Sequence, residues 1–119
     1  MRKTIICDID GTIFKHHGGQ YTQYNNPEVL PGVKSKFGEW GKKGYAIVLI
    51  SARRESDRQL TVSQLNNAGI YYDNLILGVG GGQRILINDL KPGNCDPMAV
   101  SYNVDRNFGL TNVNIDLKE

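Results

Sequence analysis

The stretch Arg2-Lys3-Thr4-Ile5-Ile6-Cys7-Asp8-Ile9-Asp10-Gly11-Thr12 decides the fold that we expect. Its apolar run, Ile5-Ile6-Cys7, predicts a strand over residues 2–9, which ends at the turn-forming pair Asp10-Gly11. Because side chains alternate along a strand, Asp8 and Asp10 should point to one side. Two close carboxylates that both ionise repel each other, so such a pair usually binds a cation or holds a proton. Magnesium, which prefers oxygen ligands, would satisfy this pair.

Helices and strands are predicted to alternate along the rest of the chain. Val33, Phe37 and Trp40 recur at helical spacing, which predicts a helix from Pro31 to Gly44. A second helix is predicted over residues 55–68 and is followed by Gly69, a residue that suits the position just after a helix. Apolar runs predict further strands over residues 45–50, 74–77, 85–87 and 98–102. This alternation predicts an α/β fold with a three-layer, Rossmann-like, doubly wound parallel sheet.

Polar side chains follow several of the predicted strands. Asp8 and Asp10 end the first strand, Ser51 ends the strand over 45–50, and Asp89 follows the run Ile85-Leu86-Ile87. Because the carboxyl ends of parallel strands meet at one edge of a sheet, we expect these four side chains to lie together.

Composition narrows the class of protein. With 119 residues the chain is long enough for one domain, and we expect a single domain over residues 1–119. The net charge of +2, with basic residues scattered along the chain, argues against a nucleic-acid partner. No apolar run approaches the roughly 20 residues that span a bilayer, so we expect a cytoplasmic protein. Cys7 is predicted to be a buried thiol and Cys95 a loop residue.

Residues 8–12 resemble the first motif of the haloacid dehalogenase superfamily, Asp-x-Asp-Gly-Thr after a buried strand, at every fixed position. The resemblance implies that Asp8 is a nucleophile that forms an aspartyl-phosphate. It also implies that Asp10 is the general acid and base, that Gly11 and Thr12 help to bind substrate, and that Mg²⁺ is the cofactor.

Later residues extend this resemblance. In the superfamily, a Ser or Thr at the position of Ser51 hydrogen-bonds the transferring phosphoryl group, and Ser51-Ala52-Arg53 is similar to the Ser-Gly-Arg of some polynucleotide phosphatases. Ala52 and Arg53 are therefore expected to bind substrate, Arg53 as a phosphate clamp. Asn88-Asp89 resembles the fourth motif and implies that Asp89 is a metal ligand with Asp8 and Asp10. Asn88 departs from the acidic residue that is usual there.

The basic residue that should accompany the nucleophile has three candidates, of which Arg84 is favoured and Lys91 and Arg58 stay open. The glycine-rich run over residues 78–82 lacks a phosphate-loop pattern and is interpreted as a flexible turn. His16 and His17 lie in a predicted loop over residues 15–26, where they could touch substrate, although adjacent loop histidines are more often only solvated.

The resemblance also indicates how substrates are selected. The chain has no room for the cap domain that many members insert, so the site should be open. Selectivity would then come from the loop over 15–26, from a neighbouring subunit of a homo-oligomer, or from a large substrate. Residues 87–92 and 103–110 look like short members associated with bacterial capsule and surface-polysaccharide synthesis.

We therefore expect a Mg²⁺-dependent phosphomonoester hydrolase that acts on a small phosphorylated substrate, such as a sugar phosphate of surface-polysaccharide biosynthesis. A polynucleotide 3′-phosphatase is one alternative, suggested by the open site and by residues 51–53. A non-catalytic binding module of the same fold is the other, because Asn88 and the unsettled basic residue depart from the motif pattern.

Overall fold

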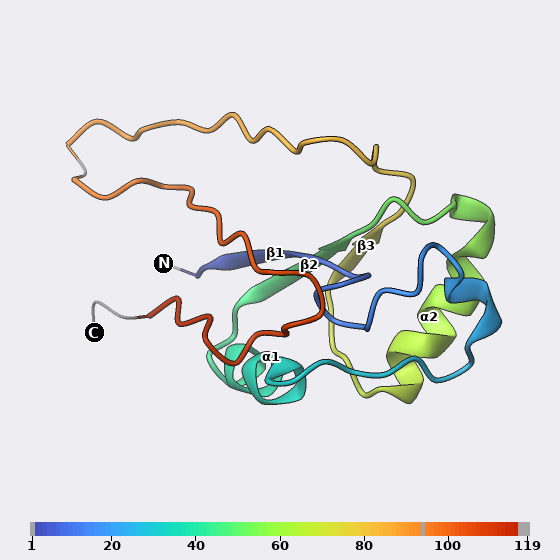
Figure 1. Cartoon of the computed structure of the whole chain (residues 1–119). Helices are drawn as coiled ribbons and strands as arrows, with labels where there is room; N and C mark the ends of the chain where they lie inside the picture. The colour runs from blue at the N-terminus through green and yellow to red at the C-terminus, as the bar shows by residue number, and fades with distance from the viewer. Residues whose placement is uncertain (1, 94, 117–119) are drawn as a thin grey trace.

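The computed structural model describes residues 2–93 and 95–116, and its centre is a parallel sheet (Figure 1). The strands β1 (Thr4–Asp8), β2 (Ala46–Ile50) and β3 (Asn74–Ile76) lie in the order β1-β2-β3. Asp8 pairs with Ile50, which pairs in turn with Ile76, so all three strands end at the same edge. The parallel α/β sheet predicted from the sequence is confirmed.

Two helices connect the strands, as the apolar spacing predicted. Helix α1 (Val33–Lys42) buries Val33, Phe37 and Trp40, the three residues on the predicted face. Helix α2 (Arg58–Asn67) follows a short 3₁₀ turn, η2 (Glu55–Asp57), and a second 3₁₀ turn, η1 (Tyr21–Gln23), lies in the loop after β1. The buried residues of α2 include the polar Thr61 and Gln64 beside Leu65, because this helix also supports polar groups near the strand ends.

Both helices pack on the same face of the sheet (Figure 1). Their apolar residues join the inward residues Ile47, Leu49 and Leu75 in one core. On the other face Ile6 and Ile76 are 53% and 49% exposed. Within the described residues both helices therefore lie on one face of the sheet, and no helix covers the other face.

The strands predicted over residues 85–87 and 98–102 are wrong. The structure has no strand there; residues 85–93 and 95 to about 105 run in a long excursion away from the body, yellow to orange in Figure 1. Ile85 and Ile87 are 78% and 91% exposed. A run of three apolar residues becomes a strand only where a neighbouring strand pairs with it, and the free edge of β1 is not paired with this run.

The chain returns to the body after this excursion. Leu110 is buried, and its backbone N–H donates to Pro31 O over 2.8 Å. Further on, the Asp116 carboxylate accepts hydrogen bonds from Lys3 Nζ (2.5 Å), Lys43 Nζ (2.7 Å) and Tyr45 Oη (2.9 Å). The last described segment is thus tied to the start of β1 and to the chain just before β2.

The two cysteines lie as predicted. Cys7 is buried in the core and Cys95 is exposed in the excursion. Burial raises the pKa of the Cys7 thiol to about 12, so this thiol stays protonated at ordinary pH. Among the described residues, every helix is too short or too polar to span a membrane.

Replacing Gly109 with alanine should destabilise the protein by about 1–3 kcal/mol. Gly109 has a φ of 82°, and an added Cβ would lie 2.2 Å from Pro31 O. Gly38→Ala is the matched control, because Gly38 lies in α1 with open space around it; it should stabilise by up to about 1 kcal/mol. Urea unfolding of both variants measures this. Equal stabilities would contradict the docking of the 105–116 segment on Pro31.

Acid should weaken the Asp116 contacts. Hydrogen bonds from Lys3 and Lys43 hold the pKa of the Asp116 carboxyl well below its ordinary value of 3.8. A lowered pKa contributes stability that is present above the unfolded-state value and lost as pH falls through the folded-state value. Melting temperatures between pH 7 and pH 2 should therefore fall less steeply for Asp116→Asn than for the wild type. Parallel pH profiles of the two proteins would show that these contacts add no stability.

Candidate active site

The loop after β1 is a tight turn that fixes the two motif carboxylates. The backbone N–H groups of Thr12, Ile13 and Phe14 all donate to Ile9 O, over 3.2, 2.8 and 3.1 Å. Gly11 has a φ of 87°, a conformation that other residues rarely adopt. Because Ile9, Ile13 and Phe14 are also fully buried, the backbone that carries Asp8 and Asp10 is held rigidly.

A pocket of about 390 Å³ lies at this edge of the sheet. The structure brings six of the predicted residues together in its lining: Asp8, Asp10, Ser51, Ala52, Arg53 and Arg84. The other lining residues are His16, His17, Gly19, Tyr21, Gly81, Gly82 and Arg106. Gly11 and Thr12, which were expected to bind substrate, lie in the turn after β1 and are not part of this lining. Three residues considered from the sequence are not part of this lining: Asp89 and the alternative basic residues Lys91 and Arg58.

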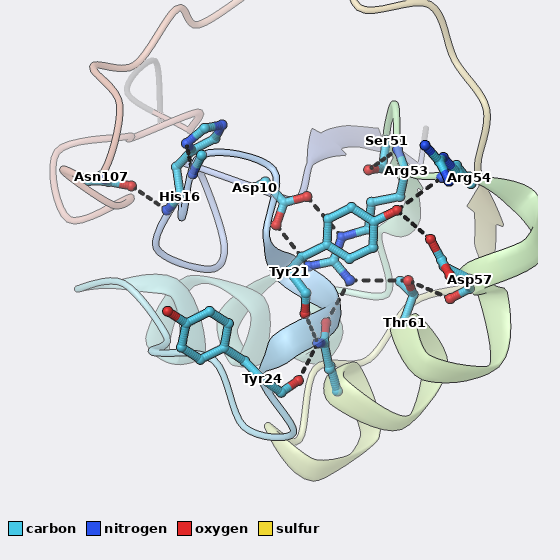
Figure 2. A network of polar contacts seen from close by, with 12 residues as sticks. Asp10, His16, Tyr21, Tyr24, Ser51, Arg53, Arg54, Asp57, Thr61 and Asn107 are labelled. Atoms are coloured by element: carbon cyan, nitrogen blue, oxygen red, sulfur yellow. Dashed lines mark hydrogen bonds and ion pairs between the residues drawn. The ribbon is translucent and has the colours of Figure 1, made fainter.

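Arg53 is the central polar side chain of the site (Figure 2). Its Nε and Nη2 donate to the two oxygens of Asp10, each over 2.8 Å, while Nη1 donates to Thr61 Oγ1 (3.1 Å) and Gln64 Oε1 (2.5 Å). The Tyr21 ring lies 4.2 Å from the guanidinium carbon. All these contacts are within the protein, so Arg53 holds Asp10 in place; the expectation that it clamps phosphate stays a prediction.

The network around Arg53 explains the polar residues buried by α2. Gln64 Nε2 donates to the carbonyl oxygens of Tyr21 (2.9 Å) and Tyr24 (2.6 Å), which ties the loop after β1 to the helix. Tyr21 Oη donates to Asp57 over 2.6 Å. No buried side-chain nitrogen or oxygen in the described residues lacks a hydrogen-bond partner. Such a fully satisfied network fixes one geometry.

Arg84 is the cation beside Asp8, at 3.4 Å from Nη1 to Oδ1. Burial raises the pKa of the Asp8 carboxyl above its ordinary value, and the positive charge of Arg84 opposes that rise. Arg58 instead pairs with Glu55 (2.5 Å) on the surface. Of the three predicted candidates, the structure places Arg84 next to the predicted nucleophile; its role in the reaction stays a prediction.

The predicted metal ligands are only partly brought together. Asp8 and Asp10 line one pocket, whereas Asp89 is exposed in the excursion. The described residues contain no group of three or more His, Cys, Asp or Glu side chains placed to hold a metal. Magnesium is commonly held by one or two carboxylates together with water and substrate phosphate, and the Asp8 carboxylate fits this ion. Both carboxylate oxygens of Asp10 accept hydrogen bonds from Arg53, so Asp10 would contribute its main-chain carbonyl oxygen. The assignment of Asp89 as a third ligand stays a prediction.

Apart from glycines, sequence reasoning missed two of the residues that line the pocket. Tyr21 packs on Arg53, and Arg106 comes from the turn after the excursion, far from any motif. No local pattern marks either residue. His16 lines the pocket, as considered from the sequence, and its backbone N–H donates to Asn107 Oδ1 over 2.7 Å. His17 also lines it and stacks on Tyr24, with ring centroids 4.1 Å apart.

Comparison with solved structures identifies the fold. Two structures of the Pnkp1/Rnl/Hen1 complex, one described as an RNA repair complex, match with TM-scores of 0.58 and 0.59 and identities of 25% and 24%. They cover 65% and 71% of this chain, which spans only 28% of the matched chain. A Vibrio cholerae protein matches at a TM-score of 0.55 and 21% identity, covering 72% of this chain and 79% of its own. No family model and no curated protein matches.

The chain has a haloacid dehalogenase-like fold. This confirms the resemblance at the level of the fold, and the pocket of this chain lies where β1 and β2 end. A D,D-heptose 1,7-bisphosphate phosphatase from B. bronchiseptica, complexed with magnesium and phosphate, is a more distant match, with a TM-score of 0.47, 18% identity, and coverage of 76% of this chain and 58% of its own.

Replacing Arg53 with lysine should lower the free energy of unfolding by about 1–3 kcal/mol. A lysine ammonium group cannot donate hydrogen bonds to Asp10, Thr61 and Gln64 at the same time. Any phosphatase activity should fall by about 10- to 100-fold, since Asp10 loses its fixed orientation. Urea unfolding and phosphate release measure the two effects. Arg54→Lys, the same change at the exposed neighbouring residue, should alter neither. An Arg53→Lys variant with wild-type stability and turnover would contradict the role assigned to Arg53.

Proposed function

We propose that this protein is a phosphomonoester hydrolase in which Asp8 is the nucleophile and Asp10 the general acid and base. The observation that carries the proposal is the pocket itself, in which the motif pair Asp8 and Asp10 lies with the Ser51 hydroxyl and the Arg84 guanidinium. These are the groups that phosphoryl transfer to a carboxylate requires: a nucleophile, a proton carrier, a hydrogen-bond donor and a cation.

In the proposed first step a carboxylate oxygen of Asp8 attacks the phosphorus atom, and the bond to the leaving oxygen breaks. For Asp10 to act as the acid, one of its oxygens must carry a proton in place of its hydrogen bond from Arg53; it gives that proton to the leaving oxygen, so the product leaves as an alcohol. In the second step Asp10 takes a proton from water, whose oxygen attacks the phosphorus atom of the aspartyl-phosphate. The bond between phosphorus and the Asp8 oxygen breaks, so inorganic phosphate leaves and the Asp8 carboxylate is regenerated. Arg53 supports both steps by holding the Asp10 side chain at one angle.

Ser51 and Arg84 would stabilise the phosphoryl group during transfer. Ser51 is 2% exposed, and its Oγ accepts the backbone N–H of Arg53 over 3.0 Å, which leaves the hydroxyl proton available for a phosphoryl oxygen. The positive charge of Arg84 beside Asp8 reduces the repulsion between this carboxylate and an incoming phosphate. Mg²⁺, held by Asp8 and Asp10 when bound, would neutralise further charge on the phosphoryl oxygens.

The proposed substrate is a sugar phosphate of surface-polysaccharide biosynthesis, and the proposed location of the reaction is the cytoplasm. It is supported by the resemblance of residues 87–92 and 103–110 to short members of that kind. Hydrolysis of a polynucleotide 3′-phosphate is the second candidate, and the likeness to the Pnkp1/Rnl/Hen1 structures favours it. The weak net charge of +2 weighs against nucleic acid. Parallel turnover of hexose phosphates and 3′-phosphorylated oligonucleotides separates the two.

The third candidate function is a non-catalytic binding module of this fold. The exposed position of Asp89, outside the pocket, supports it. Calorimetry with Mg²⁺ and fluoroberyllate, a mimic of the phosphoryl group, addresses it directly. Tight binding of both together would count against a purely structural module, whereas a folded protein that binds neither would favour it.

Purified protein should release phosphate from p-nitrophenyl phosphate only when Mg²⁺ is present. Asp8→Asn should lower kcat by about 1000-fold or more, because an amide is not a nucleophile, and Asp10→Asn by about 100-fold or more. Glu39→Gln, on the exposed surface of α1, is the matched control and should keep full activity. Undiminished turnover in Asp8→Asn would refute the assignment.

The same assay tests the third predicted metal ligand. If Asp89 contributes to the metal site, Asp89→Asn should raise the Mg²⁺ concentration needed for half-maximal activity by about tenfold or more. An unchanged requirement would remove Asp89 from the set and leave Asp8 and Asp10 as the proposed ligands.

A further inference from the structure

The pocket holds three guanidinium groups against two carboxylates. Arg53 is paired with Asp10, and Arg84 lies beside Asp8. Arg106 forms no ion pair among the described residues. In the proposed reaction Arg53 holds Asp10, and the positive charge of Arg84 reduces the repulsion between Asp8 and the incoming phosphate. Arg106 has no role in that reaction.

A specific backbone structure places Arg106 at the pocket. The next residue, Asn107, has a φ of 67°, which is unusual for a residue other than glycine. Its N–H donates to Gly11 O over 2.9 Å, and its Oδ1 accepts the N–H of His16 over 2.7 Å. These two bonds clamp the turn that carries Arg106 onto the loop after β1 (Figure 2 shows the contact of Asn107 with His16).

The side chain of Arg106 also uses the space above Gly11. A Cβ added at Gly11 would lie 3.3 Å from Arg106 Cγ, so the stem of Arg106 packs over the motif glycine. The Arg106 side chain is exposed and lines the pocket, as do His16 and His17. The lining carboxylates belong to Asp8 and Asp10, whose ion pairs within the described residues are with Arg84 and Arg53 and not with Arg106.

We propose that Arg106 binds a second anionic group of the substrate, one carried by the leaving alcohol rather than by the transferring phosphoryl group. The preferred substrates are then phosphomonoesters whose leaving group bears a carboxylate or a further phosphate. This inference rests on the proposed function. Its physical reason is charge: a guanidinium with no partner in the pocket offers a fork of donors that matches a carboxylate or phosphate.

Paired substrates that differ only in the second anion test this inference. Suitable pairs are glycerol 3-phosphate with 3-phosphoglycerate, which adds a carboxylate, and a hexose 6-phosphate with the 1,6-bisphosphate, which adds a phosphate. A 3′-phosphorylated dinucleotide adds a phosphodiester. The wild type should prefer the more anionic member of at least one pair in kcat/KM by about tenfold or more, and the pair that responds identifies the source of the anion.

Arg106→Ala should remove that preference by raising KM for the anionic member about tenfold, with kcat little changed. Arg106→Lys should restore part of it, because the charge is kept. Turnover of p-nitrophenyl phosphate, whose leaving group has no second anion, should stay within about twofold in both variants. Arg54→Ala, an exposed arginine outside the pocket lining, should leave every ratio unchanged.

Several outcomes would overturn the inference. If Arg106→Ala lost activity equally on all substrates, Arg106 would act on the phosphoryl group itself or only stabilise the fold. The inference would also be wrong if the wild type showed no preference for the more anionic substrate, or if Arg106→Ala kept that preference. Either result would show that Arg106 does not bind an anion of the leaving group. These results leave the proposed function standing, whereas a wild type that hydrolyses no phosphomonoester, p-nitrophenyl phosphate included, would remove both.

Discussion

The ion pair between Arg53 and Asp10 organises this protein. Its two parallel hydrogen bonds fix the Asp10 carboxylate in the turn just after β1, and the remaining nitrogen of the Arg53 guanidinium donates to Thr61 and Gln64 on α2. Breaking such a pair leaves an arginine that is 3% exposed without its counter-charge, which is costly. The loop after β1, the end of β2 and the helix that follows it are thereby coupled at the point where the proposed chemistry takes place.

Much of this arrangement could be predicted from the sequence because it depends on local patterns and on topology. The apolar run before Asp8 predicts a buried parallel strand, and the spacing of Val33, Phe37 and Trp40 predicts the buried face of α1. Once two strands are parallel, their carboxyl ends must meet, which brings Ser51 to the motif pair without any local signal.

What could not be predicted depends on contacts between distant segments. The run over 85–87 has the composition of a strand, yet strand formation needs a partner, and none pairs with it in the described residues. Asp89, which was expected at the shared edge because of that strand, is exposed in the excursion instead. Arg106 enters the pocket only because Asn107 and Gly109 adopt left-handed conformations that fix the turn, and sequence spacing gives no sign of this.

The central claim is that Asp8 becomes covalently phosphorylated. Acid-quenching the enzyme during turnover, reducing it with borohydride and sequencing its peptides by mass spectrometry tests this most directly, because borohydride converts an acyl phosphate of aspartate to homoserine. The account predicts homoserine at position 8 and an intact aspartate at position 10. Reduction at position 10, or steady turnover with no reduced residue at position 8, would contradict it.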